Sequence, residues 1–397
     1  MSSRLPLVFS CLGHVYMHLF TAFYFVIALS LEEVWRRPYH ELIELWWLGS
    51  LLVGLAALPA GWLGDRWSAP GMMVVYFIGL GLSGIVCGLV DQPTALFLGL
   101  TALGLFSAIY HPVGIAWLVR NATARGKALG INGIFGAVGI ASAGLVAGGL
   151  IDLFSWRAAF IVPGAVVLAT GVALLACLRL GLIVEPPVPR RSESPVQRGD
   201  MVRAFGILLL TMTIMGIVFQ GSQAAFPKVF DLRLRDIAGE GTFGIGLIVA
   251  AVYTVGGLTQ VVGGHLADKY PLKPIYIGAF LFQAPVLVGI ALMGGTPLIG
   301  LAALAVLLNS AALPAENMLL ARFTPQRHHG LAYGVKFVLA FGTAPLSIML
   351  VSTIQERTGE FVLLFLVLAA TALVATAAAM LLPGERRMSV RMPVPAE

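Results

Sequence analysis

The stretch Gly61–Arg66 (GWLGDR) recurs 203 residues later as Gly264–Lys269 (GHLADK). Each copy lies between two long apolar segments, and the offset is about half of the 397-residue chain. A repeat at that spacing predicts two related halves. In a membrane, two related halves around a central site are a common basis for alternating access, so solute transport is the leading hypothesis.

The composition indicates a protein embedded in a lipid bilayer. Apolar residues make up 58% of the chain and charged residues 11%, with a mean hydropathy of +0.91, whereas a soluble domain carries about 25% charged residues. Apolar runs of about 20 residues, enough to cross a hydrocarbon layer of roughly 30 Å, recur throughout. They lack the period-two alternation of barrel strands, so we expect an all-α membrane protein.

We predict twelve transmembrane helices in two pseudo-symmetric six-helix bundles. Residues 1–182 form the N-terminal bundle, residues 183–203 a linker rich in proline and charge, and residues 204–397 the C-terminal bundle with a short cytoplasmic tail. The expected spans are 5–30, 42–63, 70–90, 94–118, 128–151, 157–181, 204–227, 243–266, 272–293, 297–320, 331–354 and 360–382.

The basic residues predict the orientation of these spans. If the N-terminus is cytoplasmic, the inner loops and ends hold 17 Lys and Arg residues and the outer loops 7. The positive-inside rule therefore places both termini and the linker in the cytoplasm, and we expect a multi-pass protein of a bacterial inner membrane. Because the basic residues lie in short loops, the net charge of +6 does not indicate a nucleic-acid partner.

The repeated stretch ends in an acid followed by a base, at the cytoplasmic ends of the second and eighth spans. Such charges can pair with neighbouring helix ends and separate when the halves rock. The alternative is simple anchoring at the membrane surface. The duplication favours a gating role for Asp65, Arg66, Asp268 and Lys269.

The G-x-L-x-D-R/K pattern, together with twelve spans and a central linker, resembles the major facilitator superfamily. That resemblance implies its fold and, usually, a monomer. The glycine-rich fifth span, Gly133–Gly149, is similar to that of the superfamily's drug and proton antiporters. Leu12–His14 with Tyr110–Gly114 resembles the fosmidomycin-resistance-like exporters, although His18 and Val113 stand where those proteins tend to carry acids.

Histidines lie deep in two of the predicted spans. His14 and His18 are four residues apart and share a helix face, while His111 belongs to the fourth span. At 1.5 Å per residue, His14 and His111 both lie roughly 13 Å from the cytoplasmic ends of their helices. We expect them to carry protons or to bind a solute; the alternative is a hydrogen bond to a backbone carbonyl. Few carboxylates lie at that depth, so no metal site is predicted.

Two opposite charges fall inside the tenth and eleventh spans. Glu316 and Lys336 each lie roughly 9 Å from the cytoplasmic ends of their helices, and pairing would relieve the cost of a buried charge. As a functional pair they would bind a charged solute or a proton, with Asn317 extending the site. The alternatives are a structural ion pair and two side chains that reach the inner surface.

Further polar residues are candidates for solute contact. Gln220 and Gln223 lie in the outer half of the seventh span and either bind the solute or join helices. Tyr24 in the first span is a weaker candidate of the same kind.

The leading functional prediction is proton-coupled export of a small organic solute by a secondary transporter. No phosphate-binding G-x-x-x-x-G-K-S/T loop occurs, so an ion gradient is the expected energy source, and no cofactor is predicted. Uptake of a small organic anion is the alternative. An integral membrane enzyme or scaffold is a remote one, because it would not need matching loops in both halves.

Overall fold

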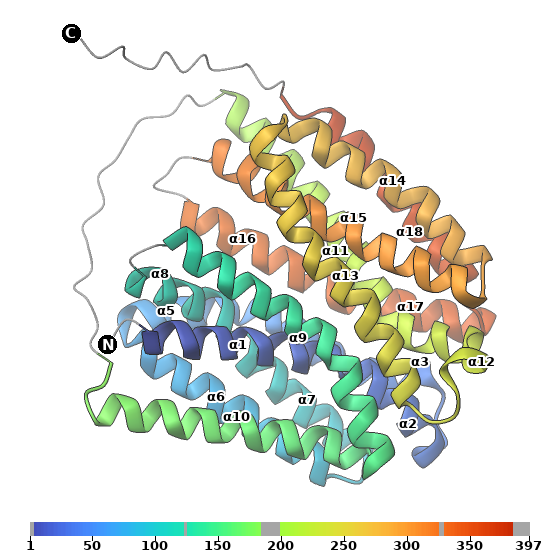
Figure 1. Cartoon of the computed structure of the whole chain (residues 1–397), viewed down its shortest axis with the longest axis horizontal. Helices are drawn as coiled ribbons and strands as arrows, with labels where there is room; N and C mark the ends of the chain where they lie inside the picture. Colours follow the sequence, from blue (N-terminus) through green and yellow to red (C-terminus); the bar gives the residue numbers. More distant parts are fainter. Residues whose placement is uncertain (1–3, 123–124, 184–198, 325–328, 384–397) are drawn as a thin grey trace.

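The computed structural model describes residues 4–122, 125–183, 199–324 and 329–383, and the elements assigned there are helices (Figure 1). Eleven helical segments of this part of the chain, some of which join consecutive elements, are long and apolar enough to cross a membrane. The pair Tyr39–Leu55 and Ala57–Arg66, bent by 41°, makes a twelfth if it is counted as one span. The predicted all-α membrane fold is confirmed.

The elements follow one another in chain order. They are α1 (Arg4–Ala22), α2 (Tyr24–Trp35), α3 (Tyr39–Glu44), α4 (Trp47–Leu55), α5 (Ala57–Arg66), α6 (Ala69–Leu89), α7 (Pro93–Ser107), the π-helical turn η1 (Tyr110–Gly114), α8 (Ile115–Asn121), α9 (Arg125–Leu153), α10 (Trp156–Arg179), α11 (Gly199–Arg233), α12 (Arg235–Ala238), α13 (Phe243–Lys269), α14 (Leu272–Leu292), α15 (Gly295–Arg322), α16 (His329–Gly342), α17 (Ala344–Thr358) and α18 (Val362–Met380).

The helices form two groups, α1 to α10 and α11 to α18, which lie against each other (Figure 1). The groups meet where α9 packs on α13, α4 on α16, α3 on α17 and α2 on α11. Of the predicted linker, residues 184–198 lie outside the described residues, as does the tail from residue 384. Helix α11 begins at Gly199, and the candidate span within it, Val202–Arg233, begins two residues before the predicted residue 204.

We call the end of the molecule that carries Arg4 and Met380 the terminal end, and the opposite end the distal end. At the distal end the two halves are joined by polar contacts. The Tyr39 hydroxyl donates to the carbonyl of Ala224 at 2.8 Å. Lys228 bridges Glu32 of the other half at 2.5 Å and Asp231 of its own helix at 3.0 Å. These contacts close the distal end.

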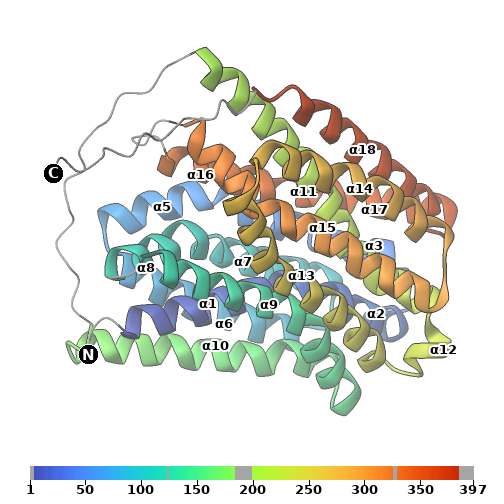
Figure 2. The ribbon, with the colours of Figure 1, turned by 45° about the horizontal axis from the view of Figure 1, so that its top comes forward.

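Toward the terminal end, α9 and α13 spread apart (Figures 1 and 2). Near the distal end a Cβ on Gly144 would meet Gly246 at 2.8 Å, and a Cβ on Gly148 would meet Thr242 at 2.6 Å. Closer to the terminal end, Gly130 and Gly133 have no such neighbour within 4 Å. The small residues of α9 therefore allow close packing against α13 near the distal end, and no such packing occurs at Gly130 and Gly133.

Candidate functional site

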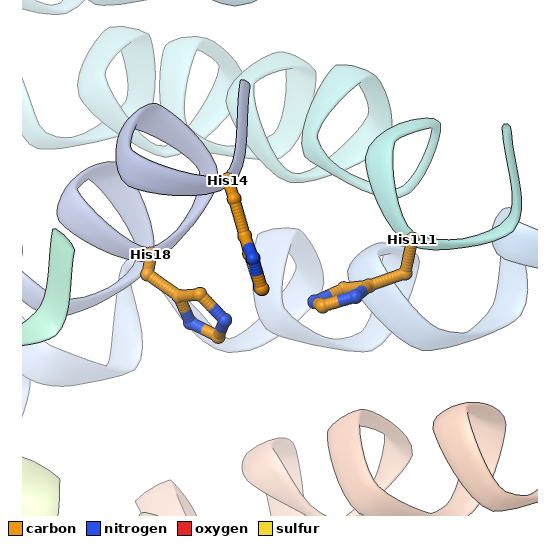
Figure 3. A group of neighbouring side chains, drawn as sticks. All are labelled: His14, His18 and His111. Atoms are coloured by element: carbon orange, nitrogen blue, oxygen red, sulfur yellow. The ribbon is translucent and has the colours of Figure 1, made fainter. Parts of the chain in front are cut away.

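The three predicted histidines lie together between the halves. The rings of His14 and His18 on α1 converge with that of His111 on η1 (Figure 3). Ring centroids are 4.9 Å apart for His14 and His18, 5.3 Å for His14 and His111, and 5.4 Å for His18 and His111. One ring nitrogen of each lies within 4.8 Å of those of the other two. We call this group the histidine triangle.

His14 is oriented by the fifth span. Its Nδ1 lies 2.7 Å from the backbone carbonyl of Asn132, so Nδ1–H donates and Nε2 is left for another partner. The Asn132 amide in turn donates to the Tyr110 hydroxyl at 2.8 Å and to Ser10 at 3.3 Å. The Ser10 hydroxyl donates to the carbonyl of Gly114 at 3.2 Å. This network fixes α1, η1 and α9 around one imidazole.

His111 lies in the π-helical turn η1, which also holds Pro112. Proline has no N–H to donate to the preceding turn, and wide turns of this kind are frequent at functional sites. The His111 ring is 8% exposed and stacks against Phe337 at 4.8 Å and Phe341 at 5.0 Å, both on α16. Among the described residues neither of its ring nitrogens has a hydrogen-bond partner.

A small pocket between the halves begins at the histidine triangle. His18, Gln220 and Gln223 all line it, so the structure brings these three predicted residues together. The remaining lining residues are Thr21, Phe25, Trp46, Ser50, Val53, Phe219, Phe341, Ala344 and Ile348. Tyr24 is not among them: it is fully buried and donates to the carbonyl of Leu42 at 2.7 Å, a contact that ties α2 to α3.

Glu316 and Lys336 form a buried ion pair, with Lys336 Nζ 2.7 Å from Glu316 Oε1. Lys336 also donates to Asn317 Oδ1 at 2.5 Å, and the Tyr276 hydroxyl donates to Glu316 Oε2 at 3.0 Å. Thr211 lies 2.8 Å from the same hydroxyl. Lys336 directly precedes Phe337, so the pair is adjacent in the chain to the aromatic cover of His111.

The predicted gate residues are exposed at the terminal end. In the described part of the chain they form no ion pair, although the guanidinium of Arg66 lies over the Trp62 ring, 5.2 Å from its centroid. This matches the spreading of the halves at that end. A gating role remains a prediction for Asp65, Arg66, Asp268 and Lys269.

Sequence reasoning missed several residues of the site. Asn132 is the only amide side chain in the fifth span, and that isolation was a usable signal. Tyr276 gave none, because a tyrosine near a helix end is ordinarily an interfacial anchor. Phe337 and Phe341 resemble any other lipid-facing aromatics in the sequence, and only the packing of α16 against η1 identifies them.

The family model of the Major Facilitator Superfamily matches residues 17–335 and 234–393. The chain belongs to the Major Facilitator Superfamily. It is therefore a transporter rather than an enzyme, which confirms the predicted family and class. In this superfamily member the pocket lies between the two helix groups.

Two solved structures share the superfamily fold of this chain. Both are of a bacterial homolog of the human lysosomal transporter Spinster, in inward-facing conformations. The occupied form has a TM-score of 0.73 at 16% identity and covers 96% of each chain. The unoccupied form has a TM-score of 0.70 at 15% identity, covering 96% of this chain and 94% of the other.

A curated relative is the puromycin resistance protein pur8 of Streptomyces alboniger, 33% identical over 132 residues. The match covers 32% of this chain and a quarter, 25%, of the relative.

Proposed function

We propose that this transporter exports a small organic solute from the bacterial cytoplasm in exchange for protons, working as a monomer in the inner membrane. The observation that carries the proposal is the buried pair of Glu316 and Lys336, two opposite charges held inside a helical bundle next to the inter-half contact. A charge inside a membrane protein is costly and marks a solute or proton path by default.

The pair supplies a way to couple the two fluxes. With Glu316 ionised, Lys336 is neutralised by it and also donates to Asn317. A proton on the carboxylate removes that partner and leaves an uncompensated buried cation, which favours rearrangement of α15 and α16. Because α16 also covers His111 and lines the pocket through Phe341, the rearrangement reaches the solute.

The proposed orientation defines the state of the molecule. The Lys and Arg distribution places the terminal end in the cytoplasm, so closure of the distal end corresponds to an inward-facing state. The inward-facing Spinster homolog structures support this reading. Rocking of the halves would then bring the acid and base pairs of the two repeats together at the terminal end.

The chemistry of the pocket and the relative both favour an organic solute and export. Trp46, Phe219 and Phe341 offer aromatic faces, and Gln220 and Gln223 offer hydrogen bonds. The matched relative is named for resistance to puromycin. Export is one way for a membrane protein to confer resistance to a small organic compound.

The test uses the full chain in proteoliposomes. A thermal-shift screen of small organic compounds, with puromycin included, first finds a compound that raises the melting midpoint. Flux of that compound is then followed with and without an imposed pH gradient. We expect the gradient to drive accumulation in the wild type. Glu316→Gln should abolish that accumulation while retaining exchange of labelled for unlabelled compound.

The matched control is Glu356→Gln, which alters an exposed carboxylate on α17. It should leave gradient-driven accumulation unchanged. Gradient-driven transport by Glu316→Gln at the wild-type rate would contradict proton coupling through this residue, and a solute flux driven against the proposed direction would contradict export.

A further inference from the structure

The histidine triangle has features that proton-coupled transport through Glu316 does not use. Three imidazoles from α1 and η1 point at one place, with their ligand atoms within 4.8 Å of one another (Figure 3). Neutral imidazole is the ligand preferred by zinc, copper, nickel and iron. Sequence reasoning disfavoured a metal because carboxylates are scarce at this depth, but a set of three histidines needs none.

The surroundings of two of these rings match those of metal ligands. His14 is 8% exposed, and its Nδ1–H donates to the Asn132 carbonyl at 2.7 Å. A ligating histidine ordinarily donates its second nitrogen to such an acceptor, which fixes the tautomer and aims the other nitrogen at the ion. In the described structure His111 is equally buried, and both of its nitrogens lack a hydrogen-bond partner. A buried polar group without a partner is costly, and an ion would satisfy it.

The distances allow coordination after small ring movements. With nitrogen to zinc distances of about 2.0–2.1 Å and tetrahedral angles, two ligating nitrogens lie about 3.3 Å apart. The largest separation here, within 4.8 Å, therefore has to shorten by about 1.5 Å at most. His18 is partly buried and faces the pocket, so its ring has room to turn toward the other two.

The charge balance indicates what the fourth ligand is. Three neutral imidazoles leave the full charge of a divalent ion uncompensated, and among the described residues no carboxylate belongs to the group. An uncompensated double charge inside a membrane protein is strongly disfavoured. The fourth position is therefore suited to an anionic donor from outside the chain, a hydroxide or an oxygen of a solute in the pocket beside His18.

We propose that His14, His18 and His111 bind one divalent transition-metal ion of the zinc class, with a fourth position open to an anionic ligand from the pocket. This site is separate from the Glu316 and Lys336 pair. It adds a metal-dependent mode of solute recognition to a transporter whose coupling does not require it.

The experiment measures metal binding by the full chain in detergent, with any affinity tag removed. Co²⁺ is the probe, because a four-coordinate Co²⁺ site absorbs visible light. One variant carries His14→Gln, His18→Gln and His111→Gln. The control carries the same number of replacements elsewhere, at His40→Gln, His265→Gln and His329→Gln. Melting midpoints and size-exclusion profiles establish that each variant is folded.

We expect the wild type and the control to bind one Co²⁺ per chain with a four-coordinate spectrum that Zn²⁺ abolishes by displacement. The site variant should bind Co²⁺ at least about 100-fold more weakly. If it does not fold, His18→Gln alone serves instead, since His18 is the least buried of the three, and a loss of about 10-fold or more is expected. Equal binding by site and control variants, or no Co²⁺ spectrum in the wild type, overturns the proposal.

Addition of azide tests the open position. A small anion that enters the fourth position changes the Co²⁺ spectrum, and that change is expected. An unchanged spectrum would mean that the protein itself saturates the ion, which overturns the open position. Because Co²⁺ binding needs neither transport nor a known solute, its failure is distinct from failure of the flux experiment. The exposed Glu356→Gln should bind Co²⁺ as the wild type does.

Discussion

At the scale of single residues, the pair of Glu316 and Lys336 has the largest predicted effect on stability. Each partner is 5–6% exposed, so removal of one leaves the other charge buried and alone. We expect Lys336→Met or Glu316→Gln alone to destabilise the protein by about 3–5 kcal/mol. The double variant should recover most of that loss, because no unpaired charge remains.

Thermal unfolding of the purified protein in one detergent measures this effect, and the four proteins of the double-mutant cycle give the coupling. A double variant whose loss equals the sum of the two single losses would show that the pair makes no joint contribution. The exposed Glu356→Gln serves as the control and should shift the melting midpoint little.

The sequence singled out residues that the structure brings together where a rare chemical type stands in an apolar run, and their functional roles stay predictions. The three histidines, Glu316 and Lys336 were recognisable because such groups are rare in a hydrocarbon layer. The contact between Glu316 and Lys336 was harder to predict, because the two residues belong to different helices. Only their similar depth in the membrane indicated that they could pair. Tyr24 shows the limit: its hydroxyl is satisfied locally by Leu42, and the sequence carries no sign of that partner.

At the scale of elements, the contact of α9 with α13 depends on glycine at the crossing point. A Cβ on Gly144 would meet the carbonyl of Gly246 at 2.8 Å and Val249 at 3.1 Å. A carbonyl belongs to the backbone and cannot turn away. We expect Gly144→Ala to weaken the distal contact, whereas Gly149→Ala, whose nearest neighbour is a Phe243 ring atom at 3.6 Å, should be tolerated.

The measurement is disulfide cross-linking between cysteines placed at the distal ends of α9 and α13 in a cysteine-free background. Gly144→Ala should lower the cross-linking rate severalfold, and Gly149→Ala should leave it near that of the parent. Equal rates in all three would show that the helices adjust without cost.

Asp152 joins the same two elements by another mechanism. Its carboxylate accepts from the backbone N–H of Thr242 at 2.9 Å, from that of Phe243 at 2.8 Å and from the Thr242 hydroxyl at 2.7 Å. A residue of α9 thus caps the N-terminus of α13, where a negative charge is favoured. Asp152→Ala should destabilise the state in which the distal end is closed by about 1–2 kcal/mol.

Spin labels on the distal ends of α9 and α13 give the distance distribution that tests the cap. A larger population of long distances is expected for Asp152→Ala. Its conservative partner Asp152→Asn keeps an acceptor and should give an intermediate distribution. Identical distributions for all three proteins would contradict a role of this cap in distal closure.

Most elements were predictable from the sequence, because long apolar runs interrupted by short polar segments leave few alternatives. The bend of 41° between Tyr39–Leu55 and Ala57–Arg66 was overlooked, although Pro59 marks it: proline has no N–H to donate to the carbonyl of Leu55, four residues earlier. The cap on α13 had no such signal. Asp152 lies at the expected end of the fifth span, and nothing local indicates that it binds a different helix.

At the scale of the whole molecule, polar contacts at the distal end join the two halves. Lys228 is central to them, because it neutralises Glu32 of the first half and Asp231 of the second. Lys228→Met leaves Glu32 without its cation and close to Asp231, which keeps its ion pair with Arg235. We expect the balance of conformations to shift away from distal closure, by a population ratio of about 10-fold for each 1.4 kcal/mol lost.

Accessibility of a cysteine at the distal face to a membrane-impermeant reagent measures that shift. Lys228→Met should raise the labelling rate, and a further Glu32→Gln replacement should lower it again by removing one of the two facing charges. A labelling rate unchanged by Lys228→Met would show that the ion pairs contribute little to closure. The division into two related halves was predictable from the recurrence of Gly61–Arg66 as Gly264–Lys269. The conformation was not, because one sequence has to be compatible with every state of the transport cycle.

The histidine triangle belongs wholly to the first half, whereas Phe337 and Phe341, which cover His111, belong to the second. A relative rotation of the halves would therefore leave the three imidazoles in register with one another and carry their aromatic cover away. The dissociation rate of a ligand bound to the imidazoles would then depend on how often the aromatic cover moves away. Its equilibrium affinity would depend on the nitrogens that bind it, so the two properties could be changed independently.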